Sequence, residues 1–327
     1  MKRLVSSTLF GLALLVFTSG VYAQACCANN VPGDITCDGK LTIADFAVWR
    51  TAYIRDRTTG TVTPAASPTI DPNPSVKPSG NVPGTFTLAV QDEFNTTSLD
   101  TTKWNLGTPW GGQFSQGEEN FTNTDYDVSG GNLNIHFKKR ASPIVVSNIT
   151  RTYDTSMIQS KGKLSVHSGQ YIEWRLKPAQ GNGFWNIAWI MPNSWPDNAC
   201  PTQQYEMDVF EHLGKGNADA LGTTTHVRNT CTTPLNTDGG LGFAPVINYS
   251  LAYHTAGVNW FADHTDIYID GNKVFTSSKF SGHDEPGFLI MNGFLGRAGD
   301  TWAGPSDAST PANAVFSIDY VRVWNRN

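Results

Sequence analysis

The sequence predicts an all-β fold for the larger part of the chain, a sandwich of antiparallel sheets. Short segments alternate apolar and polar side chains, turn signals separate them, and no convincing amphipathic helix of three turns appears there. The chain has 327 residues, of which 16% are charged and 11% are aromatic. A chain that is rich in aromatic residues and poor in charge is typical of an extracellular β protein.

Individual strands can be assigned from this alternation. Asp270 and Gly271 separate two alternating runs and predict a tight hairpin turn. Alternating strands are expected within residues 131–139, 169–177, 265–276 and 316–324.

The N-terminus has the features of a secretory signal peptide. Lys2 and Arg3 precede the apolar run Leu9–Phe17, and small residues suit cleavage before Gln24. A membrane anchor is the alternative, but this run is too short to span ~30 Å. We therefore expect residues 1–23 to be removed and the protein to be secreted, with no membrane association.

Residues 24–57 are expected to form a small calcium-binding module. Within residues 34–45, oxygen ligands are expected from Asp34, Thr36, Asp38, the Lys40 carbonyl and Asp45, at the spacing of an EF-type loop. The loop and the helical pattern after it resemble a dockerin repeat. Typical dockerins carry two repeats, so binding to a cohesin-like partner is left open. A polar turn before a helix is the alternative.

A linker and a group of cysteines complete the N-terminal part. Residues 58–84 are rich in proline and threonine and predict an extended linker. The catalytic domain is then expected to comprise residues 85–327. Because export permits disulfides, Cys200 and Cys231 are expected to pair. Three further cysteines near the mature N-terminus leave at least one without a partner among themselves, and zinc is an alternative for them.

Residues 205–214, YEMDVFEHLG, gather three carboxylates in a charge-poor chain. In a regular strand Glu206 and Asp208 would share one face, whereas Glu211 would point to the other. A β-bulge between Asp208 and Glu211 would bring all three acids to one face. Two carboxyl groups ~5–5.5 Å apart are the arrangement of a retaining glycosidase. A calcium site and a solvated strand face are the alternatives.

The acidic cluster resembles the E-x-D-x-x-E signature of glycoside hydrolase family 16. The resemblance implies a jelly-roll sandwich of two curved sheets, concanavalin-like in form, and hydrolysis with net retention. It also implies that Glu206 is the nucleophile, Glu211 the acid/base and Asp208 the assisting carboxylate. Further segments similar to the family follow in the right order at residues 92–105, 156–192, 253–276 and 317–325.

Several residues outside the cluster are expected to bind sugar, although each could instead be a structural residue. Trp110 is one aromatic candidate, and Trp185 and Trp302 match aromatic positions that contact sugar in the family. Arg175 lies opposite the apolar side of its predicted strand and is expected to reach the cleft. His226 follows the acidic strand, as a histidine does in the family, and is expected to bond sugar hydroxyls or the acid/base.

The same resemblance implies a structural calcium ion on the convex side of the sandwich. Asp319 matches the family's side-chain ligand, and Gly131 is expected to supply a carbonyl oxygen. The two calcium sites are the only cofactor sites expected.

Together these features predict an endo-acting β-glycanase for β-1,3-glucan or mixed β-1,3-1,4-glucan. The alternatives are a hydrolase of a red-algal galactan, such as agar, porphyran or carrageenan, and a lectin without catalytic activity. The formal net charge is −5, and no basic run follows the signal peptide, so nucleic acid is not an expected partner. The protein is expected to be a monomer.

Overall fold

A computed structural model provides the structure of the protein. The predictions for the signal peptide, for the N-terminal module with Asp34, Thr36, Asp38, Lys40 and Asp45, and for Cys200 with Cys231 fall outside the described residues. Among the described residues there is no helix with the length and apolarity that a membrane crossing needs. The structure describes residues 76–114, 117–197, 204–215, 218–228, 236–241, 248–299 and 302–327.

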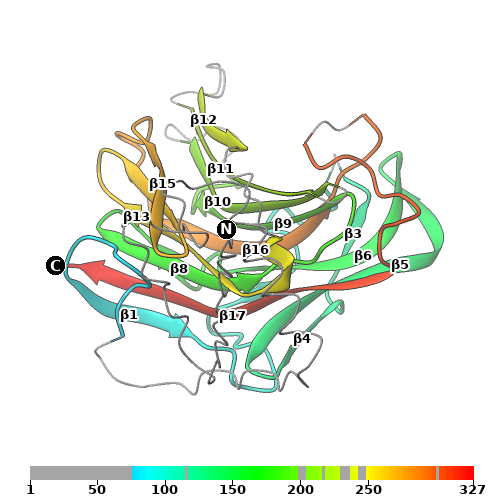
Figure 1. Cartoon of the computed structure of the whole chain (residues 1–327), viewed down its shortest axis with the longest axis horizontal. Coiled ribbons are helices and arrows are strands. Elements are labelled where there is room, and N and C mark those ends of the chain that lie inside the picture. Colours follow the sequence, from blue (N-terminus) through cyan, green and yellow to red (C-terminus); the bar gives the residue numbers. More distant parts are fainter. Residues whose placement is uncertain are drawn as a thin grey trace, which may run out of the picture. The chain divides into compact units, whose positions relative to one another are not determined.

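The first layer, called sheet A, has β17 (Asn313–Arg326) at its centre (Figure 1). This strand pairs with β8 along one edge and with β5 and β1 along the other. Beyond β8 the order is β13, β14 and β15. The other strands of sheet A are β1 (Phe86–Asp92), β3 (Glu119–Thr122), β4 (Tyr126–Ser129), β5 (Asn132–Val146), β8 (Gln170–Lys177), β13 (His254–Trp260), β14 (Thr265–Ile269) and β15 (Asn272–Ser277).

The second layer, called sheet B, runs in the order β16, β9, β10, β11, β12. The long strand β6 (Ile149–Gln159) pairs with β5 of sheet A and, near its end, with β16 of sheet B, so it links the two layers. A short 3-10 helix, η1 (Tyr249–Leu251), precedes β13. The strands of sheet B are β2 (Asn105–Leu106), β7 (Ser165–Val166), β9 (Phe184–Pro192), β10 (Gln204–Lys215), β11 (Ala218–Arg228), β12 (Asn236–Leu241) and β16 (Gly287–Leu295).

The main hydrophobic core lies between the two sheets. β10 of sheet B contributes Met207, Val209 and Phe210 to this core, and all three are fully buried. The strand alternation predicted from the sequence is confirmed in sheet A, where the expected apolar side chains of β5 and β8 are all fully buried. These are Leu133, Ile135, Phe137, Ile172, Trp174 and Leu176.

The predicted hairpin turn joins β14 to β15. Asp270 and Gly271 have φ angles of 50° and 71°, and Ile269 pairs with Asn272 across the turn. Two successive residues with positive φ are characteristic of the type I′ turn, whose twist matches that of the flanking strands. Asp-Gly is a preferred pair in this turn because both residues tolerate positive φ. The all-β sandwich and this hairpin are as predicted.

Residues 76–82 cover part of the outer face of sheet A, although the sequence predicts a free linker through residue 84. Ser79 donates from its amide and its hydroxyl to the Glu173 carboxylate, at 3.0 and 2.9 Å. Tyr320 and Tyr171 donate to the same carboxylate at 2.8 and 3.2 Å. Glu173 is fully buried, so these donors replace its water. The folded domain therefore begins before residue 85.

This contact predicts that the start of the domain affects its stability. A chain that begins at residue 85 loses both Ser79 donors, and its free energy of unfolding should fall by roughly 2–4 kcal/mol relative to a chain that begins at residue 70. Ser79→Ala in the longer chain removes one donor and should cause a smaller loss. Urea unfolding of the three proteins measures these differences. Equal midpoints for both chain lengths would contradict the interpretation.

Candidate active site

Strand β10 carries the acidic cluster and contains the predicted bulge. Its register shifts between Asp208 and Glu211 against β11, and between Asp208 and Phe210 against β9. Val209 and Phe210, although consecutive, both pack in the core. Two successive inward residues reverse the alternation, so Glu211 returns to the outer face of sheet B, where Glu206 and Asp208 lie. The bulge predicted from the spacing of the acids is confirmed.

Two neighbours hold the Glu211 carboxylate, which is only 2% exposed. The hydroxyl of Thr224 on β11 donates to Oε2 at 2.7 Å, and the indole Nε1 of Trp302 donates to Oε1 at 3.1 Å. The Trp302 bond comes from the loop before β17, so residues far apart in the sequence fix this side chain. Both carboxylate oxygens thus have a donor.

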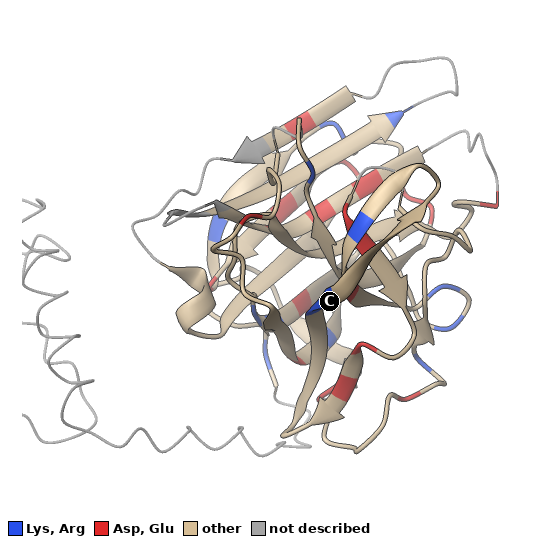
Figure 2. Ribbon diagram, turned by 90° about the vertical axis from the view of Figure 1, so that its right-hand side faces the viewer, with Lys and Arg blue, Asp and Glu red and all other residues tan. Residues whose placement is uncertain are grey.

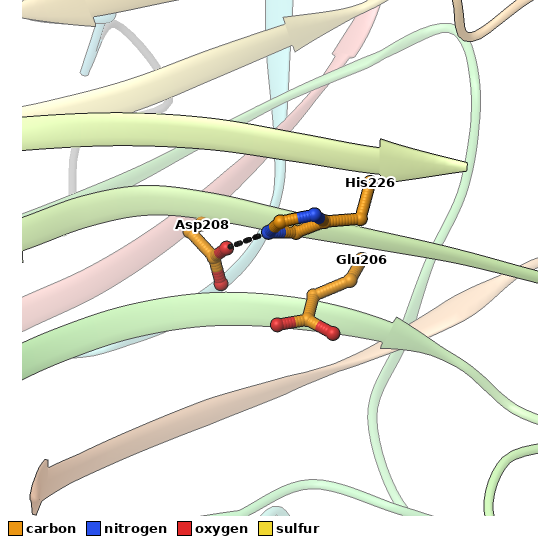
Figure 3. A group of neighbouring side chains, drawn as sticks. All are labelled: Glu206, Asp208 and His226. Atoms are coloured by element: carbon orange, nitrogen blue, oxygen red, sulfur yellow. Dashed lines mark ion pairs between the residues drawn. The ribbon is translucent and has the colours of Figure 1, made fainter. Parts of the chain in front are cut away.

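Asp208 faces His226 on the neighbouring strand β11 (Figure 3). The Nε2 atom of His226 lies 3.4 Å from Oδ2 of Asp208, and Nδ1 lies 2.8 Å from the Thr237 hydroxyl on β12. The sequence predicted that His226 would bond sugar or Glu211, whereas the structure pairs it with Asp208. Glu206 lies beside both residues and is more exposed than Asp208.

Burial dominates the electrostatics of the three acids. Burial, and then the charge of Asp208, raise the pKa of Glu206 to about 8. Burial also raises the pKa of Asp208 well above its usual value, with a further contribution from Glu211. The pKa of Glu211 is raised by burial too, although the bonds from Thr224 and Trp302 oppose the shift. The acids therefore share protons at neutral pH and do not all carry a charge.

A pocket of about 340 Å³ lies next to Glu206 on the outer face of sheet B. Its walls are mostly aromatic, and no Lys or Arg is among the described residues that line it. Over the described part of the chain, Lys and Arg are scattered along the strands and loops (Figure 2). Flat aromatic surfaces beside a carboxylate suit a sugar ring, which has an apolar face and a polar rim. The lining residues are Trp110, Gln113, Phe114, Trp185, Ile187, Trp189, Met191, Trp195, Gln204, Glu206 and Phe294.

A buried arginine fixes the loop that carries part of this wall. Arg151 on β6 donates to the carbonyl oxygens of Phe114, Gly117 and Glu119 at 2.6, 2.5 and 3.0 Å. The side chains of Arg151 and Glu119 are both fully buried, with Nη1 and Oε1 3.8 Å apart. Burial raises the pKa of Glu119 to about 8 despite this cation. Arg151 thereby holds the backbone that follows Trp110.

The adjacent acid, Glu118, connects the same loop to the loop that presents Trp302. Its Oε2 atom accepts bonds from the hydroxyls of Thr152 at 3.0 Å and Ser306 at 3.2 Å. Ser306 belongs to the loop that presents Trp302. One pair of consecutive acids therefore anchors both loops that carry aromatic residues to the site.

The predicted sugar-binding residues divide into two groups. Trp110 and Trp185 line the pocket, and Trp302 contacts Glu211. Arg175, in contrast, follows the core residue Trp174 on β8 and so points to the outer face of sheet A. The three acids lie on the outer face of the other sheet, with the core between. The prediction that Arg175 reaches the cleft is therefore wrong.

Arg175 instead forms an ion pair with Asp319 on β17. Its guanidinium also lies over the ring of Tyr253, 4.7 Å from the centroid. Because this cation already balances the Asp319 carboxylate, the arrangement does not fit a calcium ion while the pair is formed. Calcium at Gly131 and Asp319 stays a prediction, which calcium titration of the domain would test.

Several residues of the site were missed in the sequence. Phe294 forms part of the pocket, but β16 is buried along its whole length, so no alternation marks a cleft face. Thr224 stands in a run of threonines that gives no signal for the one that meets Glu211. Arg151 could have been suspected only as a cation in an otherwise β-forming segment.

Comparisons with known proteins agree with this fold. A family model described as "Beta-porphyranase A-D, GH16 domain" matches residues 87–326. The glucan endo-1,3-beta-glucosidase A1 of Niallia circulans is 30% identical over 263 residues, which are 72% of this chain and 37% of that protein. The keratan-sulfate endo-1,4-beta-galactosidase of Sphingobacterium multivorum is 29% identical over 259 residues, 73% of this chain and 55% of that protein.

A solved structure shows the same architecture. The catalytic domain of an endo-1,3-beta-glucanase (laminarinase) from Thermotoga petrophila RKU-1 superposes with a TM-score of 0.61 at 24% identity, covering 75% of this chain and 99% of that domain. The fold and the bulged acidic strand define a glycoside hydrolase sandwich. The chain belongs to glycoside hydrolase family 16.

The hydrogen bond from Thr224 gives a test of the electrostatics. Because the hydroxyl donor favours the ionised carboxylate, Thr224→Val should raise the apparent pKa of Glu211 by about one unit. Thr225→Val is the matched control, since Thr225 stands opposite the core residue Met207. NMR titration of labelled glutamate carboxyl carbons measures both. Equal pKa values in the two variants would show that Thr224 does not tune Glu211.

Proposed function

We propose that the chain is an endo-acting retaining β-glycanase that hydrolyses β-1,3-glucan or mixed β-1,3-1,4-glucan. One observation carries the proposal, namely that the bulge in β10 brings Glu206, Asp208 and Glu211 to one face beside an aromatic pocket. A lectin needs aromatic surfaces but has no use for several buried acids with raised pKa values, so hydrolysis is favoured over binding alone.

In the proposed mechanism the two glutamates act in turn. Glu206 attacks the anomeric carbon while Glu211 protonates the leaving glycosidic oxygen, and the bond between that carbon and oxygen breaks. Glu211 then takes a proton from water, which attacks the glycosyl-enzyme and releases Glu206. Two inversions at one carbon give net retention.

The raised pKa values suit these roles. Glu211 must hold a proton at the start, and burial favours its neutral form. Glu206 must be ionised to attack, which its pKa of about 8 opposes at neutral pH. Burial and the charge of Glu211 raise the pKa of Asp208 well above its usual value. A proton held by Asp208 would remove the negative charge beside Glu206 and so favour the ionised form of Glu206.

The pocket supports an unsubstituted glucan as substrate. Trp110 and Trp195 lie edge to face with centroids 5.5 Å apart, and Trp185 packs on Phe294 at 4.9 Å. A bond from the Trp185 side chain also lowers the pKa of Glu211, so Trp185 lies beside the proposed acid/base as well as in the pocket wall. An aromatic pocket whose described lining residues include no cation fits a neutral chain.

The roles of the glutamates can be separated with azide. Glu206→Ala should lose nearly all polysaccharide hydrolysis, and azide should give an α-glycosyl azide. Glu211→Ala should fail on polysaccharide but still react with an activated aryl glycoside, and azide should then give the β-azide. Glu93→Ala, which removes a carboxylate paired with Arg322, is the control and should not respond to azide. NMR of the products identifies the anomers, and swapped anomers would mean that the roles are reversed.

A red-algal galactan is the second candidate. The matching family model carries the description of a beta-porphyranase. In the structure, the position of Arg228 supports this candidate. Arg228 pairs in register with the pocket residue Gln204, two residues beyond His226 on β11, and its Nε atom is buried without a partner among the described residues. A guanidinium at this end of the pocket would suit a sulfate group.

Reducing-end release from laminarin, lichenan, agarose, porphyran and carrageenan separates the two candidates. We expect laminarin or lichenan to be cleaved fastest. Arg228→Gln should change the rates of laminarin and lichenan hydrolysis by less than about threefold, because binding of a neutral sugar does not depend on the guanidinium charge. Preferred cleavage of porphyran, with a loss of about tenfold or more in Arg228→Gln, would favour the galactan.

Three further predictions rest on the sequence alone and are part of the proposal. Residues 1–23 direct secretion, which N-terminal sequencing of the exported protein would test. The loop from Asp34 to Asp45 binds calcium, and calorimetry on residues 24–57 with an Asp34→Ala control would test it. Binding to a cohesin-like partner through the same module would be tested by pull-down with and without calcium.

A further inference from the structure

We propose that Glu206, Asp208 and His226 form a zinc-binding site that competes with glycan. One donor atom from each residue lies within 4.8 Å of the donor atoms of the other two, and no other such cluster occurs among the described residues. The three side chains converge on one space above β10 and β11 (Figure 3). A single ion could reach an imidazole nitrogen and two carboxylate oxygens there.

The distances suit tetrahedral zinc. Bonds of ~2.0–2.1 Å to nitrogen and oxygen separate neighbouring ligand atoms by roughly 3.3 Å in a tetrahedron. The observed separation between His226 Nε2 and Asp208 Oδ2 is 3.4 Å. Two of the ligands are therefore already spaced as the metal requires, and a ligand atom of Glu206 lies within 4.8 Å of both. A water molecule would complete the coordination.

A second observation points to a ligand at the same place. Asp208 is only 3% exposed, and its Oδ1 atom is buried and has no N–H or hydroxyl donor among the described residues. The Glu206 carboxyl beside Asp208 can offer it only a shared proton. A buried carboxylate oxygen without a donor is costly. A cation bound to this carboxylate would remove that cost.

Thr237 prepares His226 for metal binding. Its hydroxyl lies 2.8 Å from Nδ1, so Nδ1–H can donate to it and leave the Nε2 lone pair directed at Asp208. A histidine that binds a metal through one nitrogen usually donates from the other to such a partner, which fixes the tautomer and the ring. The residues thus supply both the ligands and the support behind one of them.

The ligand set favours zinc over calcium or magnesium. Calcium and magnesium prefer all-oxygen sites with six or more ligands, whereas zinc accepts both imidazole nitrogen and carboxylate oxygen in a four-coordinate site with a position open to water. Bound zinc would occupy Glu206, the nucleophile of the proposed mechanism. Zinc should therefore inhibit hydrolysis competitively, and this consequence rests on the proposed function, whereas binding does not.

Binding is tested first, without any substrate. Cobalt(II), which replaces zinc and absorbs visible light when tetrahedral, is titrated into the full chain, and zinc binding is followed by calorimetry. His226→Gln should weaken binding at this site by at least tenfold, and Thr237→Val, which removes only the support, should weaken it by about tenfold. His264→Ala is the matched control, because His264 also pairs with a carboxylate, Asp263 at 2.7 Å, but outside the cluster.

The full chain also contains N-terminal cysteines, whose thiolates can bind cobalt. Thiolate absorption identifies cobalt bound to cysteine, and the difference between wild type and His226→Gln identifies cobalt bound at the proposed site. Loss of one cobalt site without thiolate absorption in His226→Gln, but not in His264→Ala, supports the proposal. Identical titrations of wild type and His226→Gln, or no wild-type binding below millimolar zinc, would overturn it. A glycan that displaces zinc without being hydrolysed would keep the site and reject the proposed hydrolysis.

Discussion

The site depends on one extra residue in strand β10. Without the bulge, Glu211 would point into the core, where a carboxylate has neither water nor a donor. With it, Val209 and Phe210 both fill the core, and Glu211 meets Thr224 and Trp302 on the outer face. A backbone irregularity thus decides the face on which the acid lies, and the flanking core residues keep the irregularity in place.

Bringing three acids together costs electrostatic free energy, and the fold stabilises the three carboxyl groups to different degrees. Glu211 receives a donor at each oxygen, whereas Asp208 has His226 at 3.4 Å and the proton that it can share with Glu206, the more exposed acid. Because few donors reach it, the Asp208 carboxyl group has two roles in our proposals. It can hold a proton next to the nucleophile, and its Oδ1 atom can bind a metal ion.

The sequence predicted the sandwich, the Asp-Gly hairpin and the bulge because each rests on local spacing. The period of two reveals which residues share a face of a strand, but it does not reveal which sheet the strand joins. Arg175 was misplaced for that reason, since its strand belongs to the sheet opposite the acids. Phe294 escaped notice because aromatic packing covers the outer face of its strand, and Arg151 because its partners are backbone carbonyls brought together only by folding.

The shared anchor of the two cleft loops has a consequence for protein engineering. Glu118 and Glu119 connect the loop after Trp110 to the loop that presents Trp302. The contacts run through Arg151, Ser306 and the backbone of Leu295. The two loops therefore form one structural unit. A chimera that imports one loop from a relative with different specificity would leave a buried carboxylate or guanidinium without its partner. Transplanting both loops together with the strand between them and its arginine is the exchange that keeps every buried charge matched.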